Sequence, residues 1–350
     1  MMGWPELAAA PCGWLAEHAG NATVLSSRIR LARNLAGRPF PHHARRPQRA
    51  ELRREIFERT HGIERVEGGV RFALEDLDRV RRQFLGERQL VSQDLVESPE
   101  ARGVVIAPDQ SMSFMVNEED HLRIQALRSG LDLDGAYRGA DALERDLDAR
   151  LEFAYSERFG FLTACPTNAG TGMRASILVH LPGLVLNKEV ERVFSTLQAQ
   201  ALTIRGFYGE GSAALGNFFQ ISNATTLGIR EAEILDKLDR SARELLAWEE
   251  QAREALLSRA RSLLEDRIWR SYGVLRHARL LSAQDVLNHT SLLRLGVGLG
   301  VLQVPVQVLN EILIHGQPAH AQILGSGDHP GERDAWRAEM VRKKLRECEA

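Results

Sequence analysis

Hydrophobic and polar positions alternate in several short segments of the chain, as they do in β-strands with one buried face. Between residues 24 and 33, Val24, Ile29 and Leu31 alternate with polar residues. This pattern predicts an extended segment in which Arg28 and Arg30 lie on the same face. Further short apolar runs, bounded by turn-forming residues, predict strands at 103–107, 111–116, 159–164, 202–204 and 217–222, the first two as an antiparallel hairpin.

Elsewhere apolar residues recur every three or four positions, which predicts amphipathic helices. The longest such pattern covers residues 231–265 without proline or glycine, and a helix of that length would reach roughly 50 Å. We expect it to end at Ser271–Gly273, and Ser282 to cap the next helix. Shorter helices are predicted at 49–59, 74–85, 136–153, 190–201, 302–314 and 332–349.

The composition is that of a globular protein, with 44% hydrophobic and 26% charged residues. A formal net charge of −2 gives no overall attraction to nucleic acid or membrane surfaces, and no apolar run reaches the length of about 18 residues that spans a bilayer. Cys12, Cys165 and Cys348 are odd in number and far apart, so we expect no disulfide framework or zinc site and a reducing, cytoplasmic location. No secretion signal is predicted.

Residues 165–176 contain Gly170 and Gly172 between a cysteine and an arginine. Because glycine adopts backbone angles closed to other residues, we predict a sharp turn here. We also predict that a helix begins at Arg174 and ends at Leu181, so that its N-terminus faces an anion. A loop with a solvated arginine fits this segment equally well.

Two further segments carry an arginine beside an acidic residue. The acid-rich segment 117–124 is predicted to begin a helix on which Glu119 and Arg123 share a face, with an ordinary surface ion pair as the alternative. His121 is expected to be a packed or capping residue. The glycine-rich segment 205–212 lacks the lysine of a Walker A motif, and a flexible loop is the alternative there.

Together these motifs supply five arginines, whose planar guanidinium groups suit the oxygens of a polyphosphate: Arg28, Arg30, Arg123, Arg174 and Arg205. Glu119 and Glu210 are acids suited to a cationic acceptor, and Cys165 could lie beside the same nitrogen. A nucleic-acid-binding patch is the alternative for the arginine-rich segment 26–54, but it contains only one aromatic residue, Phe40.

Four blocks, SSRIRLARN, NEEDHLRIQ, CPTNAGTGMRAS and RGFYGEGS, resemble in order the signature blocks of the phosphagen (ATP:guanidino) kinases. The resemblance implies an α+β fold, an antiparallel sheet flanked by helices, over residues 24–252. It implies ATP as phosphoryl donor, with Mg²⁺ carried by the nucleotide and no metal site in the protein. It assigns the acceptor side to Glu119, Glu210 and Cys165. It assigns ATP binding to Ser26, Ser27, Arg28, Ile29, Arg30, Asp94, Arg123, Arg174, Ala175, Ser176, Ile177, Leu178, Arg205, Gly206, Phe207, Tyr208, Gly209 and Glu210.

Within that family the chain is similar to the bacterial kinases of protein arginine residues. Only 25 residues precede Ser26, too few for the helical domain that encloses small guanidino substrates, so residues 1–23 are expected to be a lead-in. Residues 253–350 resemble an all-helical dimerisation domain. They include an RDxxRA motif, which implies an allosteric phosphoarginine pocket formed by Arg333, Asp334, Arg337 and Ala338.

The resemblance implies protein substrates with accessible arginine residues, whose phosphoarginine marks them for a Clp-type protease or inactivates a transcriptional repressor. It also implies a homodimer and an activator protein as a possible partner, with no nucleic acid or membrane partner. One residue departs from the family: Asp94 stands where a histidine contacts the nucleotide base. This departure leaves a catalytically weak phosphoarginine-binding regulator as an alternative function. A kinase of free guanidino compounds is a third.

Overall fold

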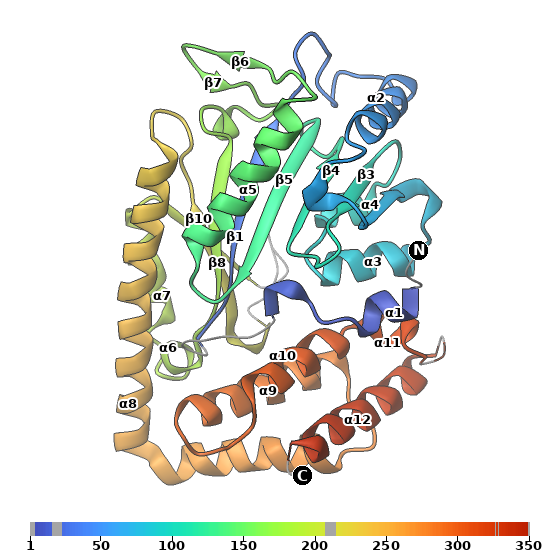
Figure 1. Ribbon diagram of the computed structural model, residues 1–350. Helices are drawn as coiled ribbons and strands as arrows, with labels where there is room; N and C mark the ends of the chain where they lie inside the picture. The colour runs from blue at the N-terminus through green and yellow to red at the C-terminus, as the bar shows by residue number, and fades with distance from the viewer. Residues whose placement is uncertain (1–3, 16–22, 207–214, 326, 328, 349–350) are drawn as a thin grey trace.

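The computed structural model describes residues 4–15, 23–206, 215–325, 327 and 329–348. An eight-stranded, fully antiparallel sheet forms its centre, in the order β2-β3-β4-β5-β1-β8-β10-β9 (Figure 1). The strands are β1 (Val24–Arg33), β2 (Val70–Ala73), β3 (Gly103–Ile106), β4 (Met112–Val116), β5 (Leu122–Ser129), β8 (Met173–His180), β9 (Leu202–Gly206) and β10 (Phe218–Asn223). A separate hairpin pairs β6 (Tyr155–Ser156) with β7 (Gly160–Phe161).

Helices flank the sheet and form the whole of the C-terminal region (Figure 1). Those of the first part are α1 (Trp4–Ala9), α2 (Arg46–Arg59), α3 (Arg79–Glu87), α4 (Gln93–Glu97), α5 (Leu133–Asp148), α6 (Pro182–Leu186) and α7 (Val190–Ala199). They are followed by α8 (Glu231–His277), α9 (Ala283–Gly298), α10 (Val306–His315), α11 (Pro318–Ile323) and α12 (Pro330–Glu347). The predicted α+β class, an antiparallel sheet flanked by helices and followed by a helical C-terminal region, is confirmed.

The largest core lies between the sheet and α5. Ile29 and Leu31 of β1, two positions apart, pack there with buried residues of α5 such as Ala140 and Leu143. Because side chains alternate between the faces of a strand, the intervening residues of β1 face the other side of the sheet. This alternation confirms the predicted extended segment and leaves Arg28 and Arg30 together on the face opposite α5.

Two predictions of helix are wrong because sheet pairing determines both segments. Residues 174–181 lie mainly in β8, where Ile177 and Val179 belong to the core and the strand pairs with β1 and β10. The segment after Asn117 is a tight turn that leads into β5. Asn117 has a φ of 58°, its backbone N–H donates to the carbonyl of His121 (3.0 Å), and Val116 pairs with Leu122.

The long predicted helix is present but extends beyond its expected end. It runs through the Ser271–Gly273 segment to His277, because Ser271 is buried and forms a hydrogen bond with His289 Nδ1 of α9 (3.1 Å). Its one residue with non-helical angles is Ala260, and Figure 1 shows the helix turning a corner. The predicted domain boundary at residue 252 lies inside this continuous helix. Ser282 caps α9, as predicted.

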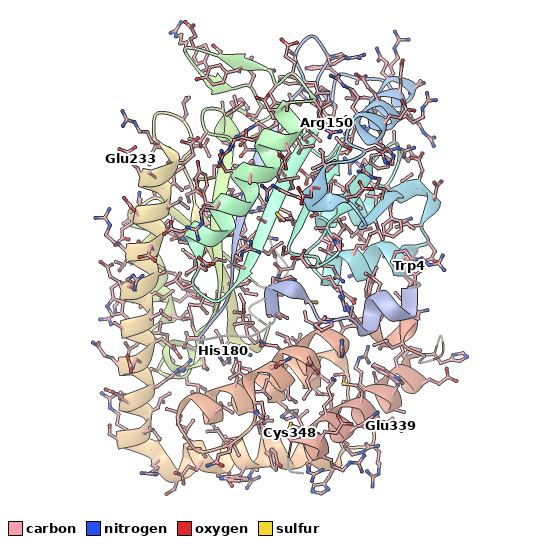
Figure 2. The ribbon with its side chains drawn as sticks, in the orientation of Figure 1. Trp4, Arg150, His180, Glu233, Glu339 and Cys348 are labelled. Carbon is pink, nitrogen blue, oxygen red and sulfur yellow. The ribbon has the colours of Figure 1, made fainter. Side chains whose placement is uncertain are left out.

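The C-terminal helices cover one end of the sheet. His180, at the end of β8, lies at this junction in Figure 2, and its Nε2 forms a hydrogen bond with Ser291 Oγ of α9 (2.8 Å). A second buried contact joins α3 to α11, where the Glu87 carboxylate accepts hydrogen bonds from the backbone of Ala319 and His320. No helix among the described residues is long and apolar enough to cross a membrane.

Candidate active site

Strand register brings the five predicted arginines onto one face of the sheet. Arg30 of β1 pairs with Arg174 of β8, and Ala32 of β1 pairs with Arg123 of β5. Directly paired residues of antiparallel strands point to the same face, so these arginines surround the middle of β1. Arg28 donates a hydrogen bond through Nη2 to Gln220 Oε1 of β10 (3.1 Å), and Gln220 in turn pairs with Arg205 of β9. We call this set the arginine face: Arg28, Arg30, Arg123, Arg174 and Arg205.

The arginines of this face repel one another. Burial, with the charges of Arg123 and Arg174, lowers the pKa of Arg28 to about 9. Burial and the same two charges, together with Arg28, also lower the pKa of Arg30, and Glu118 opposes them. The Nε of Arg30 is buried without a hydrogen-bond partner. A polyanion bound here would relieve the repulsion and supply the missing acceptor.

Other residues of the predicted ATP-binding blocks divide between the two faces of the sheet. Ile29, Ala175 and Ile177 lie in the core on the α5 side. Ser27 Oγ donates to the carbonyl of Gly130 (2.7 Å) and accepts from the backbone of Asp132 (3.0 Å), which fixes the connection from β5 to α5. The remaining predicted positions of these strands, Ser26, Ser176 and Leu178, share the face of the arginines by register.

The turn between β4 and β5 places carboxylates beside the arginine face. Glu118 is buried and pairs with Arg123. Burial favours a higher pKa for Glu118, but Arg123, the Glu119 backbone N–H, the Ser92 hydroxyl and Arg30 outweigh it and lower the pKa. Sequence reasoning overlooked Glu118, although it stands next to Glu119. The tight turn that orients it differently depends on the pairing of Val116 with Leu122 between β4 and β5.

The neighbouring Glu119 points to the predicted acceptor side. Its carboxylate accepts a hydrogen bond from Asn168 Nδ2 (3.3 Å), and the nearby Cys165 thiol, which contacts Thr167 Oγ1 (2.9 Å), acts to lower its pKa. Burial and the nearby carboxylates of Asp120 and Glu118 raise the pKa of Glu119. The structure therefore brings together Glu119 and Cys165, two of the three residues assigned to the acceptor. The third, Glu210, lies outside the described residues, as do Phe207, Tyr208 and Gly209.

The glycine turn positions Cys165 and leads into β8. Gly170 has a φ of 96°, and a Cβ there would lie 2.5 Å from the carbonyl oxygen of Thr226. Thr226 Oγ1 forms hydrogen bonds with the carbonyls of Thr167 (2.7 Å) and Ala169 (2.8 Å). Arg33, another residue that sequence reasoning overlooked, donates to the carbonyl of Thr171 (3.0 Å). The turn is thus held between β1 and the segment after β10.

The carboxylates separate two hollows. The smaller, of about 60 Å³, is lined by Arg30, Ala32, Glu118, Glu119, Asp120, Arg123, Asn168, Gly172 and Arg174. The larger, of about 510 Å³, is lined by Pro41, His42, Arg49, Asp94, Arg102, Glu118, Glu119 and Ala164. Asp94, predicted at the nucleotide base, therefore lies in the second hollow and not among the arginines. Its carboxylate pairs with Arg102 (2.6 Å).

Comparison with known proteins agrees with this geometry. The pattern described as the ATP:guanido phosphotransferase C-terminal catalytic domain matches residues 51–252, more than half of the chain. The chain belongs to the ATP:guanido phosphotransferase family. Residues 261–350 match the protein-arginine kinase McsB C-terminal domain.

Named relatives and solved structures of this phosphotransferase family extend the match. The protein-arginine kinase of Symbiobacterium thermophilum is 43% identical over 98% of this chain and 99% of its own length. That of Desulforamulus reducens is 40% identical over 93% and 92%. Lombricine kinase matches with a TM-score of 0.58 and 28% identity over 72% of this chain and 71% of its own. A duplicated taurocyamine kinase from Schistosoma mansoni, with bound transition-state analogue components, has a TM-score of 0.60 and 26% identity over 72% and 36%.

The C-terminal motif of this phosphotransferase is partly buried in α12. Arg337 donates through Nε to the carbonyl of Gly316 (2.7 Å) and through Nη1 to Asp334 Oδ1 (2.5 Å). Ala338 belongs to the core of the helical region. Of the four predicted pocket residues, Arg333 and Asp334 are therefore the more accessible. Arg337 reaches toward the junction with α3, where its charge acts on Glu87.

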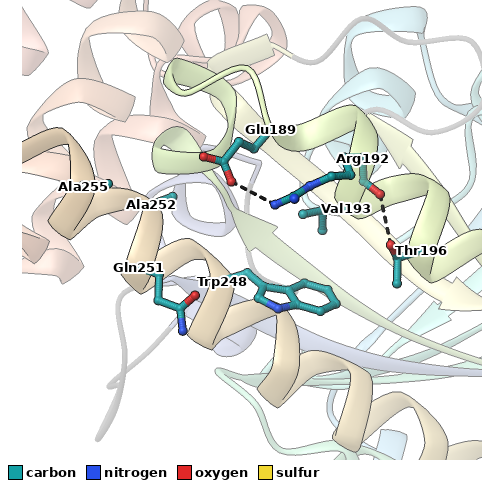
Figure 3. Close-up of a pocket in the computed structure, with 8 residues that line it drawn as sticks. All are labelled: Glu189, Arg192, Val193, Thr196, Trp248, Gln251, Ala252 and Ala255. Carbon is teal, nitrogen blue, oxygen red and sulfur yellow. Dashed lines mark hydrogen bonds and ion pairs between the residues drawn. The ribbon is translucent and has the colours of Figure 1, made fainter.

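Other features lie apart from the arginine face. Figure 3 shows a hollow of about 470 Å³ between α7 and α8, lined by Glu189, Arg192, Val193, Thr196, Trp248, Gln251, Ala252 and Ala255. It shares no lining residue with the two hollows of the active site. Among the described residues, no group of three or more His, Cys, Asp or Glu side chains could hold a metal ion.

Proposed function

We propose that this chain is a protein-arginine kinase that transfers the γ-phosphoryl group of ATP to arginine side chains of proteins. The observation that carries the proposal is the position of Glu119 and Cys165 directly beside a face of mutually repelling arginines. That arrangement pairs a polyphosphate site with a site for a cationic nucleophile. The curated relatives named protein-arginine kinase cover nearly the whole chain.

In the proposed reaction, the arginine face binds the phosphates of ATP and neutralises the charge that develops during transfer. Glu119 holds the acceptor guanidinium and takes a proton from the attacking nitrogen. That nitrogen forms a bond to the γ-phosphorus while the bond from phosphorus to the oxygen of ADP breaks. Asn168, which donates a hydrogen bond to Glu119, and the nearby Cys165 thiol would keep the carboxylate oriented. We assign Glu210 to the other side of the acceptor.

Mg²⁺ is proposed to enter with the nucleotide, where it would neutralise part of the phosphate charge. The buried carboxylate of Glu118, on the arginine side of the β4–β5 turn, is the oxygen donor suited to it or to its water shell. Asp94 is not part of the proposed nucleotide site, because it lies in the other hollow.

Several finer roles belong to the same proposal. The phosphoarginine product would mark proteins for Clp-type degradation or inactivate a repressor, in the cytoplasm and with an activator protein as a partner. Residues 253–350 would form the homodimer. Phosphoarginine would bind at α12 to Arg333 and Arg337, and it would compete with Asp334 for the guanidinium of Arg337. Because the charge of Arg337 also acts on Glu87 of α3, binding of phosphoarginine could change the junction between α12 and α3.

The test is incubation with MgATP and casein, followed by mass spectrometry under non-acidic conditions, because phosphoarginine is acid-labile. We expect phosphate on arginine residues, and transfer that is about 10²- to 10⁴-fold slower with Glu119→Gln. Absence of transfer by the wild-type protein, combined with binding of phosphoarginine, would replace the kinase by the phosphoarginine-binding regulator. Transfer to free arginine with comparable efficiency would identify a kinase of small guanidino compounds.

A further inference from the structure

The larger hollow beside Glu119 has no assigned function. It lies next to the proposed acceptor position, since it shares Glu118 and Glu119 with the arginine-face hollow and includes Ala164, which precedes Cys165. With a volume of about 510 Å³, it has room for one or more side chains of a bound protein. We call it the flanking hollow.

Most charges of the flanking hollow are already paired. Arg102 donates through Nη1 to both the carboxylate and the backbone carbonyl of Asp94 (2.6 and 2.9 Å). Glu118 pairs with Arg123, which lies outside this hollow. Glu119 is occupied with the acceptor in the proposed reaction. These pairs leave the hollow with little net attraction for a further cation.

Arg49 is the exception among the charged groups of the flanking hollow. Its Nε is buried and has no hydrogen-bond partner, and Arg49 forms no ion pair with a described residue. Its backbone carbonyl accepts a hydrogen bond from Asn117 Nδ2 (2.8 Å), which fixes this part of α2 to the turn that carries Glu118 and Glu119. An unpaired guanidinium whose Nε is buried at a fixed position favours an anionic ligand.

We infer that Arg49 binds an acidic side chain next to the target arginine of the protein substrate, so that the kinase prefers arginines flanked by Asp or Glu. The inference rests on the proposed function. When the target guanidinium reaches Glu119, the neighbouring residues of the same chain lie over the flanking hollow. A carboxylate there would complete the hydrogen bonding of Arg49, whereas a neutral amide would leave its charge uncompensated.

The nucleotide is the competing occupant of the flanking hollow. A ribose or base in it would also contact Arg49, in which case the effect of a substitution would appear in the KM for ATP. Peptide preference and nucleotide affinity are therefore measured on the same variants.

The experiment compares peptides that contain one arginine flanked by Asp or by Asn at matched positions. For the wild-type protein we expect kcat/KM to be roughly tenfold higher for the Asp peptides, the lower end for a charge-assisted hydrogen bond that solvent partly screens. Arg49→Gln should reduce the ratio to about one, and Arg49→Lys should restore part of it because it keeps the charge. The matched control is Arg46→Gln, an exposed arginine of the same helix, which should retain the wild-type ratio.

Each outcome is decisive. An equal rate on both peptides with the wild-type protein, or a preference that survives in Arg49→Gln, would refute the inference while leaving the kinase intact. A raised KM for ATP in Arg49→Gln with an unchanged peptide ratio would assign the hollow to the nucleotide. If no peptide were phosphorylated on arginine by the wild-type protein, the proposed function itself would fail, and the inference with it.

Discussion

Replacing Arg30 by methionine should stabilise the protein without nucleotide and abolish its stabilisation by ATP. The Nε of Arg30 is buried without a partner, and the charges of Arg28, Arg123 and Arg174 oppose the charge of Arg30. An unsatisfied buried donor costs about 1–3 kcal/mol, and methionine has a similar length without polar atoms. In the absence of an anion, the substitution therefore removes an unfavourable contribution to folding.

The expected change in melting temperature follows from the size of the chain. Unfolding entropy is about 2.1 cal/mol/K per residue, so the 350 residues give about 0.7 kcal/mol/K. A gain of about 1–3 kcal/mol then raises the melting temperature by about 1–4 °C. MgATP at 1,000 times its Kd would stabilise the wild-type protein by about 4.1 kcal/mol, or about 6 °C. The variant should melt above the wild-type protein without nucleotide and below it with MgATP.

Differential scanning fluorimetry with and without MgATP measures this reversal. Arg54→Met, at an exposed position of α2, controls for the loss of an arginine and should change neither melting temperature. A lower melting temperature for ligand-free Arg30→Met would refute the idea that the arginine face is strained. Equal shifts with MgATP in the variant and the wild-type protein would remove Arg30 from the nucleotide site.

Three further predictions concern the other charged groups of the structure. Glu119→Gln should lower kcat about 10²- to 10⁴-fold. In the wild-type enzyme kcat/KM should fall as the pH drops through the raised pKa of Glu119, and this fall should be absent in the variant; if it persists, another group is responsible for it. Burial lowers the pKa of His121 to about 4, below its value of about 6.5 in the unfolded chain. The neutral side chain therefore contributes about 3 kcal/mol to stability above pH 6.5, and this is lost as the pH falls to 4 because the unfolded state binds the proton more readily. Denaturant unfolding of His121→Gln at several pH values should lack that part of the pH dependence. Arg337→Ala should abolish activation by phosphoarginine, and it should destabilise the helical region because the carbonyl of Gly316 loses its donor. Calorimetry measures the stability and a phosphoarginine titration measures the activation; full activation of the variant would refute the predicted pocket.

The sequence predicted correctly those elements in which buried and exposed residues alternate with a clear period. The alternation around Arg28 and the stripe of α5 each identify a buried face, and both predictions are confirmed. Residues 174–181 were misjudged because nearly every residue of β8 is buried, so the strand lacks an exposed polar face and resembles a short helix. The β4–β5 turn was misjudged because acidic residues favour helix starts and tight turns alike.

The site residues could be predicted only as motifs, because their convergence depends on strand register. Nothing local to Arg30 indicates that Arg174, 144 positions later, is its direct partner. The same limit explains why Glu119 was chosen and Glu118 was not, since both are glutamates in one motif. Their different roles follow from the tight turn, which directs Glu118 to Arg123 and Glu119 to Cys165. The ion pair of Asp94 with Arg102 was likewise not predictable, because it depends on the packing of α4.

The arginine face is tolerated because the other face of the same strands is strongly stabilised. Ile29 and Leu31 are both at most 1% exposed, and burying such side chains contributes about 1.5–3 kcal/mol each. Their position on alternate residues fixes the register of β1 against β5 and β8. A slip of one residue would bring Arg28 and Arg30 into the core against α5 and expose the apolar residues, so the hydrophobic pattern excludes it. The packing that stabilises the sheet therefore also holds like charges together, and this enforced proximity would prepare the face for the polyanion that we propose binds there.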